Sequence, residues 1–541
     1  MIHADPNAVA SDRTRFPAKV GWLASCTLLV AIGAVTALVV RSNDGHLIYF
    51  ADDPYIHMAI AKNLARHGVW GVTPYGFSSG SSSPLWTALL ALAYLVGGVN
   101  EIAPLILNTL FGLLTVLLAS HVSRSVGGGR ASEVVVLAGV SLPVLFYTFY
   151  GMEPTLQFLL TVAFVHVAAS ALSHPGERIP VERLALLAGL ATATRYEALA
   201  LVGVVSVLFL IRREWRVALL VTLAALSPPA IVGLTGIAHG WHFLPTAVLF
   251  KSRLAYLTLG SLIRGEDPGY TGLSLPLAFL VAMAGAVLLS SIRRGRTRSA
   301  QTWWLAIFVL TSLAYAFVAR LSPQPLRRYE AHLLVLGLIA VPGPSFELLS
   351  WLREKARIGP LLAKFAAVAL ALSGLGLFAA VGHVIVDRVV TGSGYIYQQQ
   401  FQMARVVMKS FPGGTIALND IGAVNFYSEP RLLDLAGLAT KEVTDAMLAG
   451  SYDTDKIRSL AHDYNVDLVM VYREWFVGRA ALPPEWKCLM TWRISKRLTG
   501  IGGDVVSFIV PNEEMARSTM EKLQKFSPEL PRTVAVAECE G

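Results

Sequence analysis

The sequence predicts an all-α, multi-spanning membrane protein that carries a small α/β domain at its C-terminal end. Hydrophobic residues make up 54% of the 541 residues and charged residues only 15%, whereas about a quarter of the residues in a soluble domain are usually charged. Long apolar runs separated by short basic loops continue to about residue 382, and a more polar tail follows. This composition excludes an ordinary soluble protein.

The first apolar run, residues 20–40, follows a polar and basic tail of residues 1–19. The run is longer than the core of a cleavable signal peptide and lacks a small-residue cleavage site, so we expect an uncleaved anchor with a cytoplasmic N-terminus. Residues 41–101 then form the first outer loop. Within it, the apolar stretch 84–99 is shorter than the roughly twenty residues that cross a bilayer, and we expect it to lie in the membrane interface.

Eleven apolar segments are predicted to cross the membrane, and they make residues 20–382 a transmembrane domain. Loop charges test this assignment, because short cytoplasmic loops carry an excess of Lys and Arg. With 84–99 outside the bilayer core, every second loop is short and basic, which places residues 383–541 on the extracytoplasmic side. The net charge of +9 then reflects membrane orientation, and no nucleic-acid partner is predicted. The predicted crossings are residues 20–40, 102–123, 131–149, 154–172, 184–196, 198–211, 217–238, 272–291, 302–320, 329–350 and 361–382.

Two adjacent acids, Asp52 and Asp53, follow the first crossing. Pro54 suits the first helical position because its missing N–H would have no partner there. We therefore expect Asp53 to cap an amphipathic helix over residues 54–67 that lies along the membrane surface. Asp52 has no such structural task, so it is the first choice for a catalytic carboxylate.

Charged residues at the edges of the crossings are further candidates, because ionisable groups are costly near a bilayer. Glu153 lies in a Gly-Met-Glu-Pro turn, where it can also serve simply as a helix start. Arg195 and Glu197 interrupt two short apolar segments. Broken segments of this kind line cavities, although the two residues can also simply pair with each other.

Three cations on the outer side are candidates for binding an anionic ligand. Lys251 lies in an aromatic-rich loop, and Arg327 and Arg328 open a later crossing. Guanidinium groups match phosphate oxygens in bidentate fashion. The alternative is that these side chains merely reach the lipid head groups.

The tail is large enough for a domain with its own core. Its two cysteines, Cys488 and Cys539, and Cys26 in the first crossing show neither metal-ligand spacing nor a disulfide framework, and whether Cys488 and Cys539 pair is left open. We expect helices near 395–411, 440–449 and 454–464, and strands near 415–419, 467–472, 486–494 and 505–510.

Several short motifs occur in a characteristic order: Asp-Asp at 52–53, Ser-Pro-Leu-Trp at 83–86, Gly-Met-Glu at 151–153, Arg-Tyr-Glu at 195–197, Leu-Pro-Thr at 244–246 and Arg-Arg-Tyr at 327–329. Together they resemble the GT-C superfamily of polyprenyl-phosphate-sugar-dependent glycosyltransferases. Within it, the chain is most similar to bacterial AftB-like arabinofuranosyltransferases. The resemblance covers residues 20–382 and, more loosely, tail segments 419–422 and 434–438. Departures at Ser-Ser-Ser before Pro84 and at Leu-Pro-Thr leave the sugar open.

This resemblance implies inverting transfer of a sugar from a polyprenyl-phosphate donor to a glycan or lipid acceptor, at the extracytoplasmic face of a bacterial plasma membrane. It also implies a general base in the first outer loop and cations that stabilise the departing phosphate. No cofactor is predicted; the superfamily allows a divalent metal, but no further ligand cluster predicts one. The candidates are Asp52 and Asp53 for catalysis; Arg195, Lys251, Arg327 and Arg328 for the phosphate; and His57, Glu153, Glu197, Tyr329 and Glu330 for the sugar or acceptor.

Two other classes remain open. A lipid or solute transporter would explain the crossings and their charges, but it would not explain the large outer tail, and the sequence lacks the half-to-half symmetry of many transporters. A non-catalytic envelope assembly protein would explain the tail. It would also predict that both aspartates of the first outer loop can be replaced without effect.

Overall fold

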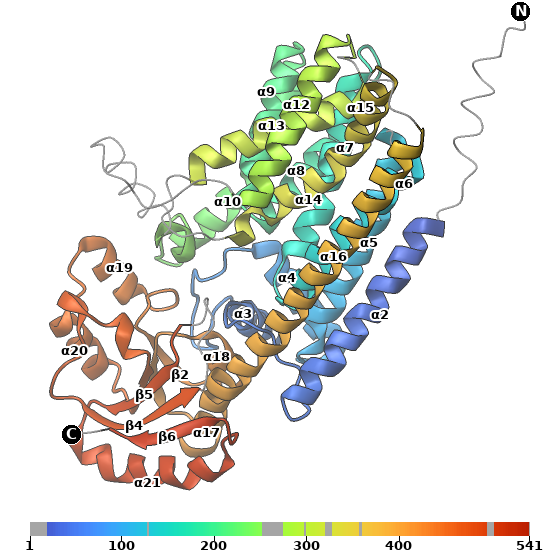
Figure 1. The fold of residues 1–541 in the computed structure, drawn as a ribbon. Helices are drawn as coiled ribbons and strands as arrows, with labels where there is room; N and C mark the ends of the chain where they lie inside the picture. The colour runs from blue at the N-terminus through green and yellow to red at the C-terminus, as the bar shows by residue number, and fades with distance from the viewer. Residues whose placement is uncertain are drawn as a thin grey trace, which may run out of the picture.

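In a computed structural model, the chain folds into a bundle of long helices and a mixed α/β domain that packs against one end of the bundle (Figure 1). The structure describes residues 19–126, 129–250, 274–296, 299–319, 327–355, 360–494 and 502–539. The predicted class is therefore confirmed. The bundle helices are α2 (Lys19–Ser42), α5 (Ile102–Val126), α6 (Gly129–Thr148), α7 (Pro154–Ser173), α8 (Val181–Thr194), α9 (Ala198–Ile211), α10 (Trp215–Ala238), α12 (Leu275–Arg293), α13 (Ala300–Ala319), α14 (Ala331–Ala340), α15 (Pro342–Lys355) and α16 (Pro360–Ile396).

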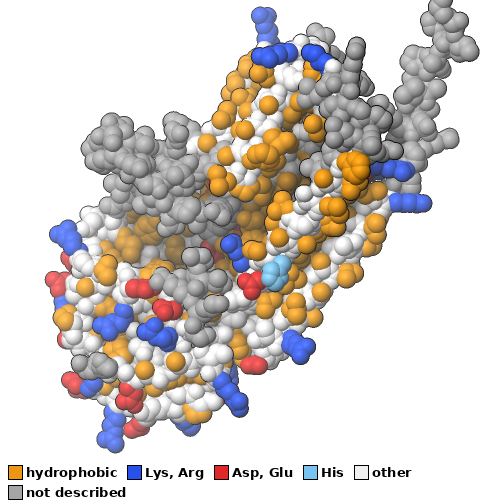
Figure 2. Space-filling view, in the orientation of Figure 1, with side chains coloured by type: hydrophobic (Ala, Val, Ile, Leu, Met, Phe, Trp, Pro, Cys, Tyr) orange, Lys and Arg blue, Asp and Glu red, His pale blue; other side chains and the backbone are white. Residues whose placement is uncertain are grey.

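Every predicted crossing contains at least one helix. Eight helical segments in the described ranges are long and apolar enough to cross a membrane by length and composition, while α4 (Pro84–Gly97), α9 and part of α13 are shorter apolar helices. The total of eleven crossings thus stays a prediction. Apolar side chains cover the visible flank of the bundle, and Lys and Arg gather at its end away from the α/β domain (Figure 2). The sequence predicts this end to be cytoplasmic.

The longest helix, α16, leads directly from the bundle into the α/β domain. It has 37 residues and continues through a short π-helix, Tyr397–Phe401, into α17 (Gln402–Ser410). The predicted boundary at residue 383 falls inside this helix, because no proline interrupts the chain between 361 and 411. The domain is therefore joined to the bundle by a continuous helical rod.

The α/β domain is built on a six-stranded mixed sheet of order β2-β1-β3-β5-β4-β6, in which β1 is parallel to β2 and β3. β2, α18, α21 and β6 were not predicted from the sequence. A disulfide joins Cys488 in β4 to Cys539, just past β6, which answers the question that the sequence left open. The strands are β1 (Thr415–Leu418), β2 (Arg431–Asp434), β3 (Leu468–Val471), β4 (Lys487–Ile494), β5 (Val505–Val510) and β6 (Val534–Glu538), and the helices are α18 (Gly422–Ser428), α19 (Lys441–Ala449), α20 (Thr454–Asp463) and α21 (Ala516–Phe526).

Helix α3 (Asp53–His67) lies between the bundle and the α/β domain. Ile56 and Ile60 belong to the core of the α/β domain, whereas Tyr55 and Met58 pack with residues of α4. The predicted helix is confirmed, and its predicted place along the membrane surface stays a prediction. Residues 54–63 are buried throughout, so this part of the helix contacts protein on all sides. Of its polar residues, Lys62 contacts α18 of the α/β domain, whereas His57 contacts α4.

Candidate active site

The carboxylate of Asp52 lies where the first outer loop meets the α/β domain. Its two oxygens accept hydrogen bonds from the backbone N–H groups of Gly422, at 2.6 Å, and Ala423, at 2.8 Å. These donors open α18, whose first N–H groups have no partner within the helix. Asp52 therefore satisfies the start of a helix in the other domain, and its side chain is only 7% exposed.

Asp420 forms a carboxyl pair with Asp52. The two side chains share a hydrogen bond, and burial together with the charge of Asp420 raises the pKa of Asp52 well above its usual value. Burial also raises the pKa of Asp420, which accepts a 2.8 Å hydrogen bond from Gln400. The hydroxyl of Tyr472, at 3.5 Å from Asp420, borders the same cluster. Two neighbouring carboxyls of this kind favour a shared proton.

The capping assignment made from the sequence is wrong. Asp52, not Asp53, occupies the N-cap position of α3, and its side chain makes no capping bond to α3. The helix starts one residue before the position that Pro54 suggests, because the backbone of Asp52 is already helical (φ −81°, ψ −33°). Asp53 is the first helical residue and is half-buried.

A second contact fixes α18 alongside α3. The ammonium group of Lys62 donates to the carbonyls of Asn425, at 3.0 Å, and Phe426, at 2.6 Å, and forms a 2.8 Å ion pair with Glu429. A cation is favourable at the carboxyl end of a helix. Asp52 and Lys62 thus hold the two ends of α18, so the position of Asp52 depends on docking of the α/β domain.

Arg195 is buried in an ion-pair cluster. Its guanidinium lies 3.0 Å from Glu153 and 2.7 Å from Glu197. The two carboxylates already compensate its charge, so Arg195 is positioned to organise this outer turn rather than to offer a free cation to a phosphate. Oε2 of Glu153 is buried without a hydrogen-bond partner in the described part of the chain.

The segment that carries Arg327 and Arg328 begins beside this cluster. It forms a 3₁₀ turn, Arg327–Glu330, and the ring centroid of Tyr329 lies 4.7 Å from the guanidinium of Arg195. A Cβ at Gly151 would meet Tyr49 and Pro54, so the turn that bears Glu153 packs on the start of α3. The side chains of Arg327 and Arg328, and all of Lys251, lie outside the described residues.

Two candidates for sugar or acceptor binding have internal roles instead. His57 is 3% exposed, and its Nδ1 lies 2.9 Å from the hydroxyl of Thr87 on α4. Glu330 is also buried, and it accepts from the backbone N–H of Ser274 at 3.2 Å. These contacts bind neighbouring elements together, and the proposed ligand contacts of His57 and Glu330 stay predictions.

The sequence analysis missed the contribution of the α/β domain to this site. The Asn-Asp-Ile-Gly segment at 419–422 is a recognisable turn, but Gly422 lies 370 residues from Asp52, and nothing local indicates that they meet. Among the described residues, no group of three or more His, Cys, Asp or Glu side chains is arranged to hold a metal ion, and no step is assigned to one.

Part of this chain matches a known family model, and its fold is similar to that of solved structures. A family model described as "Domain of unknown function (DUF8728)" matches residues 393–509. No curated protein sequence matches the chain. Among solved structures, the chain is similar to ArnT from Cupriavidus metallidurans bound to undecaprenyl phosphate, with 13% identity, coverage of 92% of this chain and 99% of that one, and a TM-score of 0.53.

A second solved structure also has a similar fold. The oligosaccharyltransferase of Archaeoglobus fulgidus in the apo form is 12% identical, with coverage of 91% of this chain and 77% of that one, and a TM-score of 0.51. Both proteins are GT-C glycosyltransferases. This chain therefore has a GT-C-like fold, with an α/β domain packed against residues 41–101.

Proposed function

We propose that this protein is a membrane glycosyltransferase that moves a sugar from a polyprenyl-phosphate donor to an acceptor on the extracytoplasmic face. The observation that carries the proposal is the Asp52 carboxylate, fixed by Gly422 and Ala423 at the junction of the two domains. The fold supports it, since ArnT has a similar fold and was solved with undecaprenyl phosphate. The likeness to arabinofuranosyltransferases remains part of this proposal.

Asp52 acts as the general base in the proposed reaction. As the acceptor hydroxyl oxygen attacks the anomeric carbon, Asp52 takes the hydroxyl proton and the bond from that carbon to the phosphate oxygen breaks. A single displacement inverts the anomeric configuration. Burial and the charge of Asp420 raise the pKa of Asp52, which makes its carboxylate a stronger base than that of an ordinary aspartate.

Cations of the outer face are proposed to bind the phosphate group of the donor. Lys251, Arg327 and Arg328 are proposed to stabilise the charge that develops on the leaving polyprenyl phosphate. Glu153 is proposed to contact the donor sugar, since its free Oε2 lies beside Arg195. Arg195 itself is reassigned from phosphate contact to positioning Glu153.

The disulfide supports the proposed extracytoplasmic location of the α/β domain. Disulfides form and persist in oxidising compartments and are rare in the cytoplasm, and this domain contains the Cys488–Cys539 bond. The proposed sidedness therefore agrees with the charge pattern of the loops.

Transfer assays with the purified protein in liposomes would test the proposal. A panel of radiolabelled polyprenyl-phosphate sugars and glycan or lipid acceptors should reveal labelled product with the parent. Product should be nearly absent with Asp52→Asn and retained with Asp44→Asn, a carboxylate of the same loop that bonds Tyr397 instead. Movement of label across the membrane without bond formation would favour a transporter, and full product with Asp52→Asn would contradict the assigned base.

A further inference from the structure

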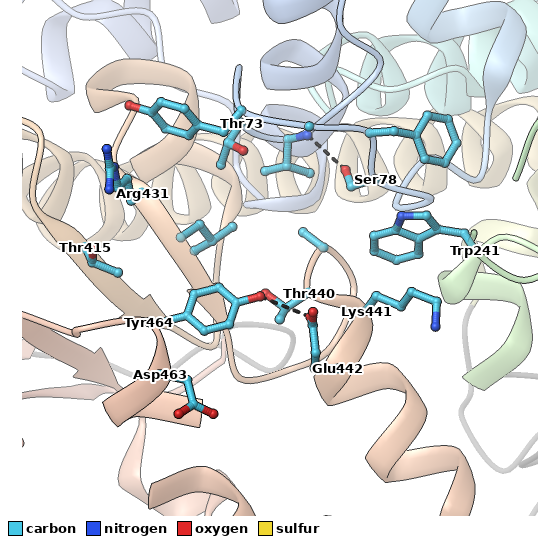
Figure 3. Close-up of a pocket in the computed structure, with 16 residues that line it drawn as sticks. Thr73, Ser78, Trp241, Thr415, Arg431, Thr440, Lys441, Glu442, Asp463 and Tyr464 are labelled. Carbon is cyan, nitrogen blue, oxygen red and sulfur yellow. Dashed lines mark hydrogen bonds between the residues drawn. The ribbon is translucent and has the colours of Figure 1, made fainter. Parts of the chain in front are cut away.

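A pocket of about 610 Å³ opens between the first outer loop and the α/β domain. Residues 72–78 of the loop form one wall, and Trp241 lies at its edge (Figure 3). The opposite wall comes from the starts of β1, β2 and α19 and from the end of α20. The pocket contains neither Asp52 nor Asp420, so it is separate from the carboxyl pair.

The lining combines flat aromatic faces with hydrogen-bonding groups of both charges. Tyr75, Trp241 and Tyr464 supply aromatic surface from three segments, and Tyr75 is 61% exposed. Arg431 lies over the Tyr75 ring, 5.9 Å from its centroid, and the Tyr464 hydroxyl donates to Glu442 at 3.0 Å. The four charged residues of the lining are Arg431, Lys441, Glu442 and Asp463.

This chemistry selects a class of ligand. Two cations and two carboxylates balance one another, which disfavours a polyanion such as a phosphate-rich head group. A sugar ring has an apolar face and a rim of hydroxyls that both donate and accept hydrogen bonds. Aromatic surface with a few placed polar groups is the lining that such a ligand requires.

The walls of the pocket are fixed by contacts between the segments that form it. The ring of Phe77 stacks on His239 at 4.3 Å between centroids, and His242 lies 2.8 Å from Asp445 of α19. The backbone N–H of Thr246 donates to Ser79 at 3.0 Å. The outer loop, residues 239–246 and α19 are thereby tied together, and a pre-formed site loses less entropy when it binds.

Strand β1 sets the distance from the pocket to the carboxyl pair. Thr415 lines the pocket, and the same chain reaches Asp420 five residues later, beside Asp52. The strand part of this stretch, Thr415–Leu418, spans on the order of 10 Å. One sugar ring cannot occupy both places, so a ligand that reaches both must be a chain of sugars.

We propose that this pocket binds internal sugar residues of the acceptor while its terminal sugar reaches Asp52, so that the natural acceptor is a glycan chain and not a lipid head group. The inference rests on the proposed function, because only a transferase has an acceptor. Binding of a glycan to the pocket does not itself require transfer. Arg431 and Glu442 provide hydroxyl contacts, and Tyr75 and Trp241 provide the stacking faces.

Binding and transfer should be measured separately on the full-length protein in detergent. Neutral oligosaccharides of one to eight sugars, titrated by calorimetry, should bind more tightly as the chain lengthens. Trp241→Ala should weaken binding of the longest by about tenfold or more, as for loss of an aromatic anchor, and Trp241→Phe should recover part of it. Trp475→Ala is the control, since Trp475 is 47% exposed and lies outside the pocket.

In transfer assays, the pocket should make long acceptors better substrates than short ones. The ratio of their kcat/KM values should fall by about tenfold in Trp241→Ala. Length-independent binding, or equal binding by parent and Trp241→Ala, would overturn the pocket assignment even if transfer is observed. Protection of the pocket by a peptide or by phospholipid vesicles, but not by oligosaccharides, would also overturn it. Glycan binding without any transfer would instead contradict the proposed enzyme and leave the pocket intact.

Discussion

The Asp52 carboxylate and the backbone of Gly422 are in direct contact across the two domains. The N–H of Gly422 donates to Oδ2 at 2.6 Å, and a Cβ on residue 422 would lie 2.2 Å from the carbonyl oxygen of Asp52 and 2.6 Å from Oδ2. Only a residue without a side chain allows this approach. The start of α18 and the candidate base therefore position each other.

Gly422→Ala tests this contact. Because the new methyl group would overlap the backbone of Asp52, the domains must separate locally, and we expect a loss of about 1–3 kcal/mol in stability, as for overpacking, with a matching fall in transfer. Thermal unfolding in detergent and initial rates would measure both. Gly394→Ala is the control, since a Cβ there meets neighbours only at ordinary contact distances, 3.8 Å or more. Equal behaviour of the two variants would contradict the role of Gly422.

Asp52→Asn should lower turnover by roughly a hundredfold or more, as for loss of a general base, with little change in donor binding. Asp53→Asn should be milder, because the backbone donors at the start of α18 bond the carboxylate of Asp52. Initial rates and donor-binding isotherms would separate the two effects. A larger loss of turnover with Asp53→Asn than with Asp52→Asn would mean that Asp53, not Asp52, is the general base.

The pH dependence of transfer should report the carboxyl pair. Burial and the neighbouring charge of Asp420 raise the pKa of Asp52, so the rate should fall with acidification at a higher pH than an ordinary aspartate would give. Asp420→Asn removes the like charge and should move this acid limb to lower pH. A profile of kcat/KM against pH for the parent and Asp420→Asn would measure the shift. An acid limb at the same pH in both proteins would exclude coupling between Asp52 and Asp420.

The same pair affects stability with a definite sign. Above the ordinary aspartate pKa and up to the raised values, the folded protein holds more protons than the unfolded chain, so its free energy of unfolding decreases as pH rises through this window. Asp420→Asn should flatten this dependence. Chemical unfolding followed at several pH values would measure the slope in the parent and the variant.

The Cys488–Cys539 bond should stabilise the α/β domain. It closes a loop with a sequence separation of 51, for which removal typically costs about 2–4 kcal/mol. Cys488→Ser should therefore lower the melting temperature of the non-reduced protein and have little further effect once reductant is added. A melting temperature equal to that of the parent without reductant would show that the bond does not form.

Sidedness can be tested with single cysteines in a background that carries Cys26→Ser. A membrane-impermeant thiol reagent should label Ser451→Cys, at an exposed position after α19, in intact cells. Arg213→Cys, in the basic loop between α9 and α10, should be labelled only after permeabilisation. The reverse pattern would invert the predicted orientation.

The sequence by itself determined the membrane class, the helices of the bundle and the presence of a C-terminal α/β domain, because hydrophobic patterning is a local property of the chain. It also located the acid pair after the first crossing. It missed the start of α3 by one residue, since that boundary depends on backbone angles rather than on Pro54.

Only the tertiary structure decided which groups meet. Arg195 looked like a cation for phosphate, but folding places two carboxylates around it. Asp52 looked free of structural tasks, but docking of a domain 370 residues away supplies two backbone donors. These contacts arise from burial of α3 between two cores, and a pairing that depends on which surfaces bury each other cannot be read from the residues on either side alone.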